Sequence, residues 1–164
     1  MELTQEKAHE LFEYKDGELF FKPYKISLNR QSKKAGWKVG TDSGHGYLSF
    51  QYQKKKYYIH QIIFLMQYGY IPKLIDHIDG NGMNNKIDNL READKIKNSY
   101  NAKIRTNNTT GHKGVVWHKN GKKWMVSITE NKKIKYLGLY NDFELACLVS
   151  DEARDLYHGK FARI

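Results

Sequence analysis

Residues 72–101 are rich in Asp, Asn and Gly and contain few large apolar side chains. A compact fold is driven by burial of apolar surface, and this segment offers little of it, so packing alone does not explain its composition. Asp, Asn and Gly favour turns and loops over regular helix or strand. The polar side chains of this segment therefore need a chemical explanation.

The length of 164 residues predicts one or two domains and leaves no room for a large α/β enzyme. No apolar run approaches the roughly 18 residues of a membrane span, so we expect no membrane partner. The acidic N-terminus lacks the basic start of a signal peptide, which predicts a cytoplasmic protein. A single cysteine, Cys147, allows no intrachain disulfide and no Cys-x-x-Cys zinc site, so oxygen and imidazole would hold any metal.

The charge balance favours a polyanionic partner. There are 28 Lys and Arg residues against 18 Asp and Glu residues, a formal net charge of +10. Residues 101–164 hold 12 basic and 6 acidic residues, and residues 24–56 hold eight basic residues against Asp42 alone. Nucleic acid is the first candidate for the partner, and a solubilising surface is the alternative.

The first 56 residues predict a β-rich N-terminal element. Thr4 can cap a short helix, and Asp16-Gly17 can form a tight turn into a strand. Aromatic or apolar residues alternate with polar ones through 46–52, and Lys54, Lys55 and Lys56 separate this run from the apolar run 57–59, which predicts a hairpin with a basic tip. A short buried helix should follow and stop near Gly69.

Residues 113–164 predict a three-stranded antiparallel sheet packed on one helix, separated from residues 57–105 by a linker at 106–112. The overall fold class is therefore α+β. Asp142 can cap a helix whose buried face would comprise Leu145, Ala146, Val149, Ala153 and Leu156. Three aromatic residues are expected in the core beneath it: Trp124, Tyr136 and Phe143.

Asp76 and His77 place a carboxylate and an imidazole on adjacent residues, and adjacent side chains of a strand point to opposite faces. The carboxylate could then hold a cation while the imidazole acts on a water molecule. Asp94 can cap a helix with Asn98 near its first turn, so the chain could fold back to bring Asp76 and Asn98 together.

This pattern resembles the HNH nucleases of the ββα-metal fold. Asp76-His77, Asn89-Leu90 and Asn98 match in type and spacing, within a resemblance that covers about residues 57–101. The subgroup resembled is the phage and intron-encoded homing type, in which asparagine replaces the last histidine; Gln61 stands where arginine is common.

The resemblance implies a role for each matching residue. Asp76 and Asn98 would be metal ligands, His77 the general base, and Asn89 the residue that constrains the loop holding His77. One Mg²⁺ or Mn²⁺ ion suits such oxygen donors, and a neutral histidine can accept a proton at physiological pH. The alternatives are an Asx-rich loop of structural use and a calcium loop, although the carboxylate spacing of an EF-hand is absent. Two roles are equally compatible with the position of His60: packing at the start of a helix, or a contact to phosphate.

Residues 110–164 resemble the Apetala/ethylene-response-factor DNA-binding domain, which lays a three-stranded sheet in the major groove. The resemblance rests on the runs Lys113–Trp117, Lys123–Ile128, Tyr136–Tyr140 and Leu156–Ala162. Plant members carry base-reading arginines where this chain has Val116, Thr129 and Ile134. The predicted DNA contacts of the sheet are Lys113, Trp117, His118, Lys119, Lys122, Lys123, Lys133 and Lys135. The predicted hairpin at 46–59 adds Lys54, Lys55 and Lys56.

Together these features predict a divalent-metal-dependent HNH endonuclease of phage or mobile-element type that cuts double-stranded DNA as a monomer or homodimer. One nuclease centre per chain implies nicking, and a double-strand break would need a dimer or two successive events. A non-catalytic DNA-binding regulator with an HNH-like scaffold is the alternative. An RNA-directed nuclease is a weaker one, because no aromatic platform for splayed bases is evident.

Overall fold

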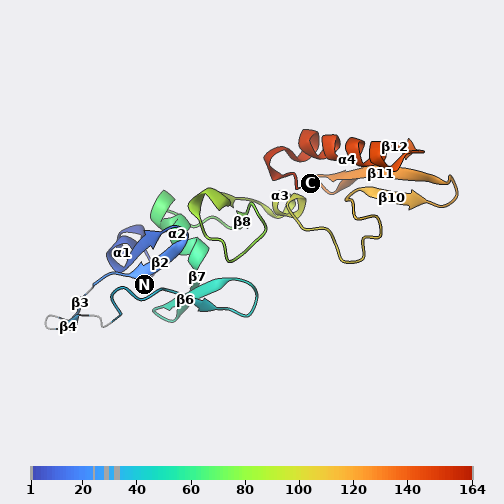
Figure 1. The fold of residues 1–164 in the computed structure, drawn as a ribbon. Helices are drawn as coiled ribbons and strands as arrows, with labels where there is room; N and C mark the ends of the chain where they lie inside the picture. The colour runs from blue at the N-terminus through green and yellow to red at the C-terminus, as the bar shows by residue number, and fades with distance from the viewer. Residues whose placement is uncertain (1, 24, 28–29, 32–33, 164) are drawn as a thin grey trace. The chain divides into compact units, whose positions relative to one another are not determined.

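The computed structural model describes residues 2–23, 25–27, 30–31 and 34–163 (Figure 1). It divides the chain into two compact units, Met1–Ala93 (unit 1) and Asp94–Ile164 (unit 2). Both units mix helices with small antiparallel sheets, which is consistent with the α+β class. None of the helices in the described parts of the chain is long and apolar enough to cross a membrane.

Among its described residues, unit 1 contains two helices, four small sheets and one 3₁₀ turn. The sheets have the orders β1-β2, β3-β4, β5-β6-β7 and β8-β9. In chain order the elements are α1 (Gln5–Leu11), β1 (Phe12–Lys15), β2 (Glu18–Phe21), β3 (Lys25–Ser27), β4 (Arg30–Gln31), β5 (Thr41–Asp42), β6 (Leu48–Tyr52), β7 (Lys55–Tyr58), α2 (Ile59–Tyr68), β8 (Ile75–His77), η1 (Ile87–Asn89) and β9 (Leu90–Glu92).

Local signals set the start of unit 1 as predicted. The Thr4 hydroxyl accepts a hydrogen bond from the Lys7 N–H and caps α1. Asp16 and Gly17 both have positive φ in the turn between β1 and β2, the conformation that tight hairpin turns require. Gly17 also lies against the Lys86 backbone, where an added Cβ would sit 2.9 Å from the Lys86 nitrogen. This turn therefore packs on the polar loop that precedes β9.

Helix α2 is the centre of the unit 1 core. Ile59 and Ile62 are almost completely buried, together with Phe12 and Leu19 of the first hairpin. The Phe12 ring packs against Phe50 with centroids 5.4 Å apart. The helix ends at Gly69, whose left-handed conformation allows its N–H to bond the Leu65 carbonyl. The core thus fixes the helix whose first turn borders the β8–β9 hairpin.

Unit 2 contains helix α3 (Lys95–Tyr100), an antiparallel sheet of β10 (Val115–His118), β11 (Lys123–Glu130) and β12 (Lys133–Tyr140), helix α4 (Phe143–His158) and η2 (Gly159–Phe161). Helix α4 covers one face of the sheet (Figure 1). Asp142 caps α4 by accepting from the Leu145 N–H, as predicted. Val115, Val126 and Ala146 form the buried centre between sheet and helix.

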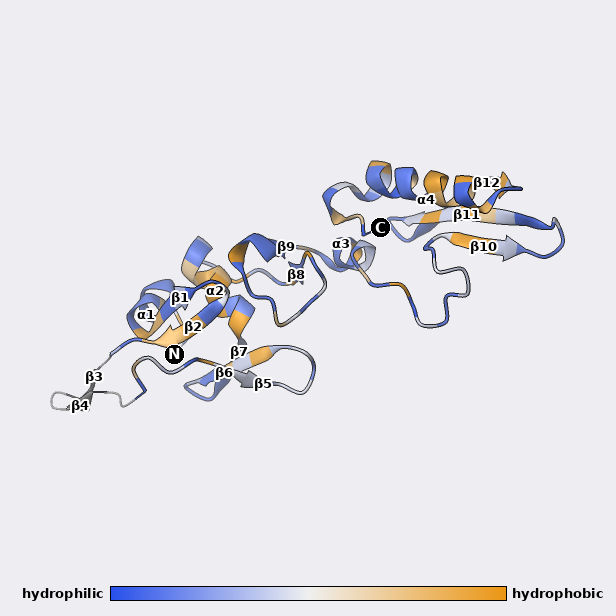
Figure 2. Ribbon diagram, in the orientation of Figure 1, coloured by the Kyte–Doolittle hydropathy of each residue, from blue (hydrophilic) through white to orange (hydrophobic). Residues whose placement is uncertain are grey.

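Three apolar residues predicted in the unit 2 core are exposed instead. Leu145 and Leu156 of α4 are 48% and 76% exposed, and Tyr136 of β12 is 61% exposed. The buried stripe of α4 runs through Ala146, Ser150 and Ala153, which turns both leucines outward. Strand alternation places Leu137 on the helix side of the sheet and therefore Tyr136 on the other. Figure 2 shows the resulting mixture of hydrophobic and hydrophilic residues along α4.

The linker predicted at 106–112 lies inside unit 2. The Asn108 carboxamide accepts from the backbone N–H groups of Thr110 and Gly111, and the Thr110 hydroxyl donates to the Val115 carbonyl. These bonds tie the segment to the start of β10. The division between the two compact units falls at Ala93 and Asp94, within residues 57–105.

Replacing Val126 by alanine should lower the free energy of unfolding of unit 2 by about 2 kcal/mol, because two fully buried methyl groups are lost and a cavity remains. Leu156→Ala is the matched control and should change it by less than about 0.5 kcal/mol. Urea unfolding followed by tryptophan fluorescence, to which Trp117 and Trp124 contribute, measures both. An equal loss of unfolding free energy in the two variants would contradict the orientation of α4, which turns Leu156 outward.

Candidate active site

The β8–β9 hairpin carries the chemistry-bearing residues of unit 1. Its antiparallel register places Asp76 opposite Arg91 and His77 opposite Leu90. The polar loop and η1 connect the two strands. Because side chains directly opposite each other share a face of the ladder, the register puts the acid and the arginine side by side.

Asp76 is held by a buried ion pair. The Arg91 guanidinium donates from Nε and Nη2 to Asp76 Oδ2, over 2.8 Å and 2.6 Å. The Asp76 side chain is 5% exposed and that of Arg91 12% exposed. Charged groups removed from water need a partner of opposite charge, and here both bonds end on the same carboxylate oxygen. The pair fixes the orientation of the carboxylate and places a positive charge beside it.

His77 is buried and oriented by Asn85. The ring Nε2 lies 3.1 Å from Asn85 Oδ1, and Asn85 Nδ2 donates to the Met83 carbonyl. The second bond turns the amide oxygen toward the imidazole, so Nε2 is the donor of the pair. In the neutral ring, Nδ1 is then the nitrogen without a proton. Asn85 thereby selects which atom of His77 can accept one.

Asn89 ties the loop together. Its Oδ1 accepts from the Asp79 N–H, while its Nδ2 donates to Asp79 Oδ1 and to the Asn84 carbonyl. Burial raises the pKa of Asp79, but hydrogen bonds from Asn84, Asn81 and Asn89 outweigh it and lower the pKa overall. This geometry joins both ends of the loop that follows His77.

His60 packs against His77 from the first turn of α2. The two rings are perpendicular with centroids 5.0 Å apart, and His60 stacks on Tyr58. Burial, followed by the proximity of His77, lowers the pKa of His60 to about 4. The ring is therefore neutral at pH 7. Its burial supports the packing interpretation of this residue over a phosphate contact.

Asn98 lies on α3 in unit 2, whereas Asp76, His77 and Asn89 lie in unit 1. Asp94 caps α3 by accepting from the Lys97 N–H, as predicted. The Asn98 side chain is exposed. The structure thus gathers three of the four predicted site residues in one hairpin and places the fourth within unit 2.

The donor chemistry fits a hard divalent ion. A carboxylate from Asp76 and an amide oxygen from Asn98 are the ligand types of Mg²⁺ and Mn²⁺, which keep several water ligands when few protein groups bind them. Within the described ranges, no cluster of three or more His, Cys, Asp and Glu side chains forms a metal cage. The residues suit an open oxygen site better than a closed zinc site.

The basic tip of the β6–β7 hairpin is smaller than predicted. Lys54 lies in the turn after β6 with a φ of +67°, but Lys55 and Lys56 belong to strand β7. Lys55 forms an ion pair with Glu2, and the Lys56 ammonium lies over the Tyr58 ring. All three lysines are exposed.

The predicted DNA contacts of unit 2 fall into two groups. Trp117, His118, Lys119, Lys122, Lys123 and Lys133 lie on the β10–β11 hairpin or at the start of β12. The other two, Lys113 and Lys135, use their ammonium groups elsewhere: Lys113 donates to the Arg163 carbonyl, and Lys135 pairs with Glu130 beside the Tyr157 ring. A shared sheet surface for all eight residues is therefore not observed.

Arg91 and Asn85 are site residues to which the sequence alone assigns no role in the site. Arg91 follows Asn89-Leu90 and reaches Asp76 only through the strand register. Asn85 belongs to an Asn-Asn doublet typical of a turn, and its sequence position gives no sign of burial. Pairing the two strands so that His77 faces Leu90 places Arg91 beside Asp76, because side chains alternate between the two faces of each strand.

The β8–β9 hairpin lies within a segment that matches a known protein family. Residues 57–100 match the HNH endonuclease family. The chain is 40% identical over 97 residues to Protein 3.8 of Escherichia phage T7, an alignment that covers 58% of this chain and 79% of the relative. No solved structure matches the chain. The family match ends at residue 100, so the resemblance of residues 110–164 to a plant-type DNA-binding domain stays a prediction.

Replacing His60 by phenylalanine should weaken the acid sensitivity of unit 1. The unfolded chain binds a proton near pH 6.5, whereas folded His60 does so only near pH 4. The stability linked to this group is thus complete above pH 6.5 and falls toward pH 4, by at most about 1.4 kcal/mol per pH unit. Urea unfolding of both proteins at pH 7 and pH 5 measures the difference. If wild type and His60→Phe lost equal unfolding free energy between pH 7 and pH 5, the neutral, buried state of His60 would be contradicted.

Proposed function

The chain belongs to the same family as Protein 3.8 of Escherichia phage T7 and contains an HNH endonuclease domain, and from this premise we propose that it hydrolyses phosphodiester bonds of double-stranded DNA with one divalent cation. The observation that carries the proposal is the β8–β9 hairpin, which holds a buried carboxylate and a buried imidazole on adjacent residues within the matched segment.

His77 supplies the general base. Its Nε2 donates to Asn85, so Nδ1 of the neutral ring accepts the proton of the attacking water. The water oxygen forms a bond to phosphorus as the bond to the 3′ oxygen breaks, and that oxygen then takes up a proton. Arg91 and Asn85 act before the reaction, because they hold Asp76 and His77 in fixed orientations.

Asp76 and Asn98 are the proposed metal ligands, by their match to the family. A bound Mg²⁺ or Mn²⁺ supplies positive charge that stabilises the phosphate oxygens and the leaving 3′ oxygen. Asn89 acts at a distance by holding the loop, through its bonds to Asp79 and Asn84. One such centre per chain predicts nicking by a monomer and double-strand cleavage by a homodimer or by successive cuts.

Unit 2 is proposed to bind DNA. Residues 101–164 have twice as many basic as acidic residues, and lysine side chains meet phosphate oxygens when strands approach the duplex. The proposed contacts of the sheet are the exposed Lys119, Lys122 and Lys133, the partly exposed His118 and Lys123, and the half-exposed Trp117. Lys54, Lys55 and Lys56 are proposed to add phosphate contacts from unit 1.

His77→Ala should slow nicking of supercoiled plasmid by about 10²- to 10⁴-fold, the usual effect of losing a general base. His9→Ala is the matched control, since that imidazole bonds the Met66 carbonyl of α2 and is none of the proposed site residues, and it should cut at the wild-type rate. Agarose gels with Mg²⁺ or Mn²⁺ measure the rates, and a chelator should stop wild-type cutting. DNA binding without scission over a range of sequences would instead support a non-catalytic regulator.

Asn85→Ala should slow nicking by about 10- to 100-fold, because His77 loses the acceptor that sets its tautomer. Asn85→Asp keeps an oxygen toward Nε2 and should recover most of that loss. The ¹⁵N shifts of the His77 ring report the tautomer in each variant. An unchanged ring spectrum and unchanged cutting in Asn85→Ala would exclude this positioning role.

A further inference from the structure

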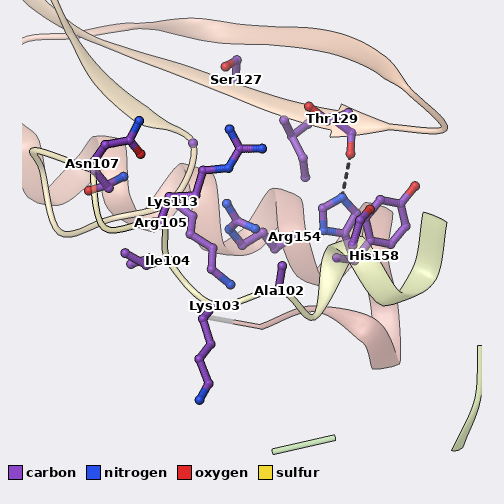
Figure 3. A pocket seen from close by; sticks show the side chains of 15 residues that line it. Ala102, Lys103, Ile104, Arg105, Asn107, Lys113, Ser127, Thr129, Arg154 and His158 are labelled. Carbon is purple, nitrogen blue, oxygen red and sulfur yellow. Dashed lines mark hydrogen bonds between the residues drawn. The ribbon is translucent and has the colours of Figure 1, made fainter. Parts of the chain in front are cut away.

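Unit 2 contains a cavity of about 500 Å³ whose lining includes none of the proposed catalytic or metal-binding residues. It is bordered by the segment after α3, by strand β11 and by helix α4 (Figure 3). None of the described residues that line it is acidic, whereas five are basic or imidazole side chains: Lys103, Arg105, Lys113, Arg154 and His158. The side chains that line the cavity therefore carry a net positive charge.

Arg154 is the most informative residue of the cavity. The side chain is on the sheet-facing side of α4, and the residue is 8% exposed. Its Nε is buried and has no hydrogen-bond partner in the part of the chain that the structure describes. Arg91 of unit 1, similarly buried, bonds a carboxylate through two nitrogens. Burial lowers the pKa of Arg154 overall, because it outweighs the charge of Asp151, on the same face of α4, which favours the charged form. A buried guanidinium whose Nε bonds no acceptor is costly, which indicates a site completed by an anion from outside.

Two neighbouring side chains, Lys113 and His158, also bear on the ligand of this cavity. Lys113 donates to the Arg163 carbonyl, and burial, together with the charges of Arg154 and Arg163, lowers its pKa to about 8. His158 donates from Nε2 to the Thr129 carbonyl, and its Nδ1 is buried without a partner among the described residues. An anion in the cavity would relieve the repulsion and raise the pKa of Lys113.

We propose that this cavity binds a phosphate group of a nucleic-acid strand, with Arg154 and Lys113 as its inner contacts and Arg105 as an outer one. Figure 3 shows these three basic groups gathered beneath the sheet, whereas Lys103 points away. The guanidinium fork suits phosphate oxygens, and Ser127 and Thr129 add hydroxyl groups to the lining.

The choice of a DNA strand as the source of the phosphate rests on the proposed function, while the phosphate chemistry rests on the cavity alone. The volume exceeds that of one phosphate, so a nucleotide unit of a strand fits. The proposed sheet contacts His118 and Lys123 do not line the cavity. The site would therefore give unit 2 a second point of contact with the backbone, which fixes its orientation on DNA.

Inorganic phosphate is the first probe, used with the full chain. Phosphate should raise the melting temperature relative to sodium chloride of equal ionic strength, and Arg154→Met should abolish this rise. Because the substitution removes a buried charge whose Nε has no hydrogen-bond partner among the described residues, the variant should be at least as stable as wild type without phosphate. Lys113→Met is the second variant and should weaken phosphate binding in the same way. A phosphate response that persists unchanged in both variants would overturn the proposal.

Duplex DNA is the second probe, followed by fluorescence anisotropy over several salt concentrations. Arg154→Met should weaken binding by about tenfold or more and reduce the salt dependence by about one phosphate contact. Lys160→Met, a charge removed outside the cavity, is the control and should bind within about threefold of wild type. DNA should also displace bound phosphate.

The outcomes separate this site from the nuclease proposal. Phosphate binding that DNA does not displace would overturn the assignment to a nucleic-acid strand and indicate a free phosphate or nucleotide as the ligand. The wild type could fail to nick DNA while Arg154→Met loses DNA affinity. That result would reject the nuclease function and still support the phosphate site.

Discussion

The antiparallel pairing of β8 with β9 is the constraint on which the site depends. Its register sets Asp76 beside Arg91, and the ion pair between them forms only in that register. A slip of one residue would move every side chain of the strand to the opposite face and separate the buried charges. The strand pairing brings the two charges together, and the ion pair in turn favours this register over others. The same pairing fixes the position of His77, the next residue of the strand.

The polar composition of the loop between β8 and β9 follows from this arrangement. A loop that cannot bury apolar surface is held by side-chain hydrogen bonds, and the bonds of Asn89 to Asp79 and Asn84 join its two ends. Asn85 turns inward and bonds His77. Each of these hydrogen bonds contributes about 1 kcal/mol to stability. Their importance for function is that they fix the orientation of the loop and of the His77 ring. The same residues explain the composition of the segment, the order of the loop and the direction of the imidazole.

Features set by nearby residues were predictable from sequence. The caps at Thr4 and Asp142 and the Asp16-Gly17 turn are local hydrogen-bond or φ preferences, and the structure confirms them. The exposure of Tyr136 and Leu156 was not predictable, because it depends on which face of the sheet and helix the partner covers. The pairs Asp76–Arg91 and His77–Asn85 depend on strand register and loop path. The metal role of Asn98 and the DNA contacts stay predictions.

Manganese binding tests the central claim most directly, since it reports the metal site without requiring cleavage. Electron paramagnetic resonance of Mn²⁺ titrated into the full chain should show one bound ion per chain. Asp76→Ala should lose it, and so should Asn98→Ala. Asp88→Ala, an exposed carboxylate of the same loop region, should retain it. Binding that persists in Asp76→Ala at wild-type affinity would contradict a metal centre built on the β8–β9 hairpin.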